Sequence, residues 1–109
     1  MAVHVIFADN DNVIEVTDLK NLVDGAFQNA ATVTVTITDS DGNEVAGETW
    51  PLTLPYVSGS EGDYRANLAD TISFVATNEY TADVIADAGA NGRARWPDEE
   101  VIARTRKSN

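Results

Sequence analysis

The chain has 109 residues, 43% of them hydrophobic, which suits one domain with a single core and is too short for two. It contains no cysteine, so disulfides and thiolate metal sites are excluded and a reducing cytoplasm is compatible. The net charge is −11, and such an acidic surface repels phosphate backbones, so outside the C-terminal tail we expect no nucleic-acid partner.

Hydropathy gives no indication of a membrane. No run approaches the roughly 20 apolar residues that a membrane-spanning helix needs. The first residues lack the basic region and long apolar run of a signal peptide. We therefore expect a soluble protein with no membrane partner.

The sequence pattern in the first quarter of the chain predicts short strands and turns. Residues alternate over 3–7, which predicts a strand, and a turn over 9–12 and a short strand over 13–16 follow. Residues 17–25 have apolar spacings of three and four that allow one helical turn, but so short a segment predicts only a connector.

The clearest pattern is a strict alternation over residues 31–38, which places apolar side chains on one face of a strand and threonines on the other. The apolar set is Ala31, Val33, Val35 and Ile37, and the threonine row is Thr32, Thr34, Thr36 and Thr38. We interpret this row as a solvated face, with the binding of a partner strand or sheet as the alternative.

A hairpin turn is predicted over 39–43, because Asp and Asn bond their own backbone and Gly42 tolerates a positive φ. In the returning strand over 50–56, the apolar residues share one parity while Pro51 and Pro55 share the other. Both missing amide donors therefore lie on one lateral edge, which predicts an edge strand or a strand that leaves its sheet near Trp50.

Further strands are predicted over 64–68, 72–76 and 80–87, separated by a loop over 58–62 and followed by a glycine-rich turn over 88–92. This gives seven or eight short strands with a turn about every ten residues. The predicted fold is all-β, an antiparallel immunoglobulin-like β-sandwich formed by residues 1–109 as one domain.

The tail allows two readings. Pro97 followed by three acidic residues, with basic residues later, suits a helix dipole, yet residues 101–106 also alternate, and a sandwich needs a closing strand, so we favour the strand. Residues 1–92 carry fifteen acidic and two basic residues, whereas 93–109 carry three acidic and five basic ones. We expect the basic tail to close the sheet with a solvated edge, with docking on the acidic face of a neighbouring copy as the alternative.

No motif assembles a reactive centre. The segment from Asp39 to Glu44 is superficially similar to a calcium loop, but Gly42 is misplaced and Trp50 occupies the twelfth position, so a plain turn is favoured. His4 is the only histidine and is interpreted as structural. We predict no catalytic, cofactor-binding or metal-binding residue, and no enzyme activity or cofactor.

The two tryptophans, Trp50 and Trp96, could stack on sugars. Each directly precedes a proline and shares its parity with apolar neighbours, which favours packing instead.

Several segments together resemble a known class of module. They are the run from Ala30 to Asp39, then Asp41-Gly42-Asn43, Trp50-Pro51-Leu52 and the stretch from Gly59 to Arg65. Over roughly Val13 to Arg106 the chain resembles small Ig-like structural modules of tailed phages and prophages, similar in kind to the N-terminal modules of baseplate upper proteins.

The resemblance implies a non-enzymatic structural or assembly protein of the virion, at the head-tail connection or tail, assembled in the bacterial cytoplasm. Its implied partners are other virion structural proteins or further copies of itself, as a homo-oligomer. The alternative function is a carbohydrate- or surface-binding Ig-like module of a bacterial protein, which would use Trp50 or Trp96.

Overall fold

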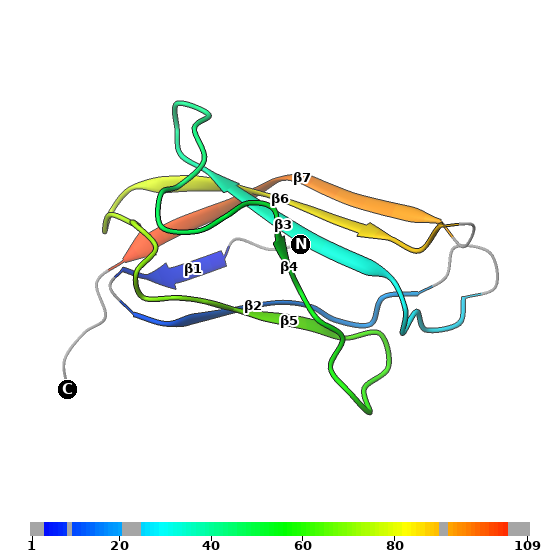
Figure 1. Ribbon diagram of the computed structural model, residues 1–109. Coiled ribbons are helices and arrows are strands. Elements are labelled where there is room, and N and C mark those ends of the chain that lie inside the picture. The colour runs from blue at the N-terminus through cyan, green and yellow to red at the C-terminus, as the bar shows by residue number, and fades with distance from the viewer. Residues whose placement is uncertain (1–3, 9, 21–24, 90–91, 105–109) are drawn as a thin grey trace.

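The computed structural model describes residues 4–8, 10–20, 25–89 and 92–104, and these form an almost entirely β structure (Figure 1). The seven strands are β1 (His4–Phe7), β2 (Asn12–Val16), β3 (Thr32–Thr38), β4 (Leu52–Thr53), β5 (Tyr64–Leu68), β6 (Glu79–Asp87) and β7 (Arg93–Arg104). The all-β prediction is confirmed.

The strands form two sheets that lie one above the other (Figure 1). One has five strands in the order β1-β7-β6-β3-β4, and the other pairs β2 with β5. The pairs β2–β5, β3–β4, β3–β6 and β6–β7 are antiparallel, whereas β1 runs parallel to β7. The larger sheet is therefore mixed, which departs from the predicted antiparallel pattern. Residue alternation predicts that a strand exists but does not fix the direction of its neighbour.

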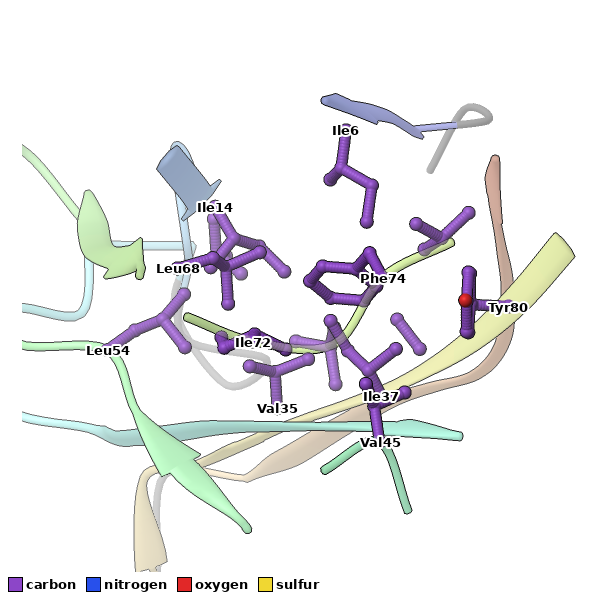
Figure 2. Packing of buried hydrophobic residues seen from close by; sticks show 14 of the residues in the cluster. Ile6, Ile14, Val35, Ile37, Val45, Leu54, Leu68, Ile72, Phe74 and Tyr80 are labelled. Atoms are coloured by element: carbon purple, nitrogen blue, oxygen red, sulfur yellow. The ribbon is translucent and has the colours of Figure 1, made fainter. Parts of the chain in front are cut away.

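The core lies between the two sheets and is built by the predicted alternation. Val33, Val35 and Ile37 of β3 are fully buried, as is Val84 of β6, and side chains from β2 and β5 meet them from the opposite layer. Figure 2 shows this arrangement, with Ile14 and Leu68 across the core from Val35 and Ile37. The members of the threonine row differ, because Thr32 is exposed whereas Thr34, Thr36 and Thr38 are half-buried.

The predicted hairpin over 39–43 is confirmed. The Asp39 amide donates to the Asn43 carbonyl at 2.8 Å, and the Gly42 amide donates to the Asp39 carbonyl at 3.0 Å. One carboxylate oxygen of Asp39 accepts the amides of Asp41 and Asn43, so the side chain stabilises its own turn.

The proline-containing segment forms the short edge strand β4, as predicted. The Leu54 amide donates to the Val33 carbonyl at 2.8 Å, so amides of that parity point toward β3 and those of Pro51 and Pro55 would point away. The chain then crosses to the other sheet, where the Val57 amide donates to the Asp63 carbonyl at 2.9 Å. It leaves its sheet after Leu54 rather than near Trp50.

The strand predicted over 72–76 is wrong. The Ile72 amide donates to Ala69 at 3.1 Å and the Phe74 amide to Ile72 at 2.8 Å, which are local turn bonds. Ile72 and Phe74 are nevertheless buried, at 2% and 7% exposure. Their alternation arises because both side chains enter the core from an irregular segment.

The tail forms the strand that we favoured over a helix, and β7 extends from Arg93 to Arg104. Residues 105 and 106 lie outside the described residues.

The described part of the segment over 17–25 is a connector, as predicted, and a contact distant in sequence rather than a helical hydrogen bond holds it: the Leu19 amide donates to the Gly62 carbonyl at 2.9 Å. Gly62 has φ +75°, and a Cβ there would lie 2.5 Å from the Leu19 carbonyl oxygen, so this approach needs glycine. Leu22 and Val23 lie outside the described residues.

Candidate interaction surface

A cavity of about 300 Å³ lies beside the 39–43 hairpin. It is lined by Asp39, Glu44, Val45, Ala46, Ser73, Val75, Asn78 and Tyr80. Its acidic groups would favour a cation, but one oxygen of Asp39 already serves the turn. No cluster of three or more potential metal-ligating side chains occurs in the described part of the chain.

Trp50 serves the core, as the packing interpretation predicted. Its indole is half-buried against the hydrophobic cluster, and its Nε1 donates to the Val45 carbonyl at 2.8 Å. The indole N–H is therefore already satisfied within the protein. Trp96 is paired with Val84 in the β6–β7 register, and its side chain lies outside the described part, as does that of His4.

The threonine row continues across the outer face of the five-stranded sheet. Thr36 lies opposite Asp83 of β6, whose carboxylate accepts two hydrogen bonds from Arg95 of β7 at 3.0 and 2.9 Å. Thr34 lies between Ile85 and Thr53 of the adjacent strands. Among the described side chains this face is polar apart from Ile85, and it carries the partly exposed Arg95–Asp83 ion pair.

Three of the four outer strand edges are partly covered or lack some of their donors. The β4 edge lacks the amides of Pro51 and Pro55. On β1, the Phe7 amide donates to the Asn12 side chain at 2.9 Å, and the Asn12 amide nitrogen donates back to the Phe7 carbonyl at 3.0 Å. On β5, the Arg65 amide donates to the Pro55 carbonyl at 3.0 Å.

The fourth edge belongs to β2. It is formed by the outward backbone groups of Val13 and Glu15, and we call it the β2 edge. Arg65 is paired with Glu15 in the β2–β5 register, and the Arg65 amide points away from β2. The Glu15–Arg65 pair therefore makes no backbone hydrogen bonds across the ladder, and the amide and carbonyl of Glu15 also point outward. By the same alternation, the amide and carbonyl of Val13 also point outward. The described residues provide no backbone partner for these groups.

The side chains on this part of β2 are suited to a protein contact. Val13 is 62% exposed, one of only two large hydrophobic residues so exposed among the described residues. Glu15 forms an exposed ion pair with Arg65 at 3.2 Å, which offsets its charge. The sequence predicts the strand but not this edge, because local alternation carries no signal that β2 has one neighbour instead of two.

Comparison of the chain with protein-family models gives no match, and comparison with curated proteins gives none either. The described residues include no helix that is long and apolar enough to cross a membrane.

Proposed function

We propose that the chain is an Ig-like structural module of a tailed-phage or prophage particle, which acts without catalysis by associating with other virion proteins or with further copies of itself. The strand order supports the Ig-like assignment. In variable-type Ig domains the strands C′, C, F and G adjoin in one sheet and B pairs with E in the other. The order β4-β3-β6-β7 over the pair β2–β5 corresponds to that arrangement.

A tyrosine contact gives independent support. Ig-like sandwiches carry a tyrosine near the start of strand F whose hydroxyl bonds to backbone a few residues upstream. Tyr80 is the second residue of β6, and its hydroxyl accepts the Val75 amide at 2.8 Å. Ala82, two residues later, is fully buried where antibody domains place a disulfide cysteine.

The observation that carries the associative role is the small size of the second sheet. β2 and β5 form a two-stranded layer, whereas independent sheets usually need three or more strands or a covering element. The five-stranded sheet stabilises one face of this pair, and the β2 edge stays open. A module that acts by docking has reason to keep such an edge available.

The test is the composition of particles purified from the strain that encodes the chain. Quantitative mass spectrometry should find the chain in a fixed ratio to the coat protein, and antibody-gold labelling should place it at one site on the particle. Recovery of the chain from the cell lysate, but not from particles that carry their full complement of other proteins, would overturn the proposal.

A further inference from the structure

We infer that the β2 edge binds the β2 edge of a second copy in antiparallel orientation, which joins the two small sheets into a continuous four-stranded sheet, β5-β2-β2-β5. This inference rests on the proposed function, because it names the partner and the surface for association. A strand edge with free amides and carbonyls is a template for such pairing.

The register follows from which groups point outward. With Val13 and Glu15 outward on both copies, a two-fold axis beside Ile14 places each Val13 opposite Glu15 of the other copy. Each contact then exchanges backbone hydrogen bonds, and both contacts are equivalent by symmetry. The edge is therefore self-complementary.

The side-chain rows in this register contain no like charges directly opposite each other. Across the four strands, one row of neighbouring side chains consists of Arg65 and Glu15 of the first copy followed by Val13 and Asn67 of the second. The two-fold axis generates a second row with the same residues in the opposite order. The Glu15–Arg65 ion pair offsets the carboxylate at the seam. Val13, now 62% exposed, gains the methylene groups of Glu15 as neighbours.

The molecule's acidity explains why this register matters. Each copy carries a net charge of −11, so an interface that set carboxylate against carboxylate would be unfavourable. The proposed seam avoids that arrangement while using a backbone edge on which both outward residues, Val13 and Glu15, are open.

Charge variants at Val13 test the inference by sedimentation velocity of the full chain, over roughly 10 to 1,000 μM because small interfaces are weak. Val13→Lys places a cation opposite Glu15 of the other copy in both rows, and Val13→Glu places a second carboxylate there. We expect Val13→Lys to tighten the dimer and Val13→Glu to weaken it, each by about tenfold, because the change acts on two charge pairs in every dimer.

The matched controls are Val75→Lys and Val75→Glu. Val75 is the other highly exposed valine and lies in the segment before β6, away from β2, so the same changes in net charge occur off the interface. Val75 variants that shift dimerisation as much as the Val13 variants would overturn the inference, because net charge alone would then explain both series. A reversed order at Val13 would overturn the register.

Val13→Pro tests the backbone contribution. It removes an amide that the β2–β5 ladder does not use, and we expect a monomer with a urea midpoint close to that of the unmodified chain. If this variant unfolds, the charge series still decides the question. A chain that stays monomeric yet is present in particles would overturn this inference while leaving the proposed function intact.

Discussion

At the scale of single residues, Tyr64 links segments that are far apart in sequence. Its side chain is 1% exposed, and its hydroxyl donates to the Gln28 carbonyl at 2.6 Å and accepts the Ala31 amide at 3.0 Å. It thereby fastens β5 to the segment that enters β3. Tyr80, also buried, makes one hydroxyl hydrogen bond to the described residues, as the acceptor of the Val75 amide.

These two tyrosines give a matched pair of substitutions. Tyr64→Phe should lower the free energy of unfolding by about 2 kcal/mol and Tyr80→Phe by about 1 kcal/mol, because the first removes two hydrogen bonds and the second one. Urea unfolding of both variants measures the difference. A larger loss for Tyr80→Phe than for Tyr64→Phe would contradict this account of the Tyr64 hydroxyl.

The same residues show what the sequence could predict and what it could not. The burial of Val33, Val35 and Ile37 and the outward edge of Pro51 and Pro55 follow from parity, which is local. The partners of the Tyr64 hydroxyl lie 36 and 33 residues away, and no local pattern encodes them. The outward direction of the proline edge was predicted correctly, while the threonine row is more buried than the solvated face that the sequence predicted.

At the scale of elements, the segment 69–76 shows how alternation can mislead. Phe74 is buried and packs edge-on against Tyr80, with ring centroids 5.2 Å apart, although its backbone is in no strand. Val75 beside it is 57% exposed. The segment contributes to the core through side chains alone, and Figure 2 shows Ile72 and Phe74 lying between the two layers.

Substitution of adjacent residues tests this arrangement. Phe74→Ala should lower the free energy of unfolding by about 3 to 5 kcal/mol, as expected for a buried aromatic side chain. Val75→Ala should change it by less than about 0.5 kcal/mol, because its side chain is mostly in water. Denaturant unfolding gives both values, and comparable losses at the two positions would mean that Phe74 is not in the core.

The direction of each strand and the identity of its neighbours could not be predicted from the sequence for a related reason. The pairing of β1 with β7 joins Val5 to Ile102, almost the whole chain apart, and depends on the assembled sheet. Because β1 lies beside β7, β2 keeps one neighbour and its edge stays open. The open β2 edge thus arises from topology rather than from any motif.

At the scale of the whole molecule, charge opposes compaction. The net charge of −11 is confined within extents of 44 × 32 × 23 Å. At about 10 mM salt the screening length is roughly 30 Å, so like charges repel across the molecule, whereas at about 150 mM it is roughly 8 Å. The ion pairs Glu15–Arg65 and Asp83–Arg95 act in the opposite sense, since salt weakens them, but exposed pairs contribute at most about 1 kcal/mol each.

We therefore expect the free energy of unfolding to rise by about 1 kcal/mol between these salt concentrations, because screening relieves repulsion that the expanded unfolded chain feels less. Urea unfolding at micromolar protein, where a weak dimer dissociates, gives the value. The control is the double variant Asp41→Asn, Glu79→Gln, which neutralises two exposed acids and reduces the net charge from −11 to −9. Its salt-dependent gain should be smaller and its low-salt stability higher. A midpoint that falls as salt is added would instead show that the two surface ion pairs outweigh the repulsion among the remaining acidic groups.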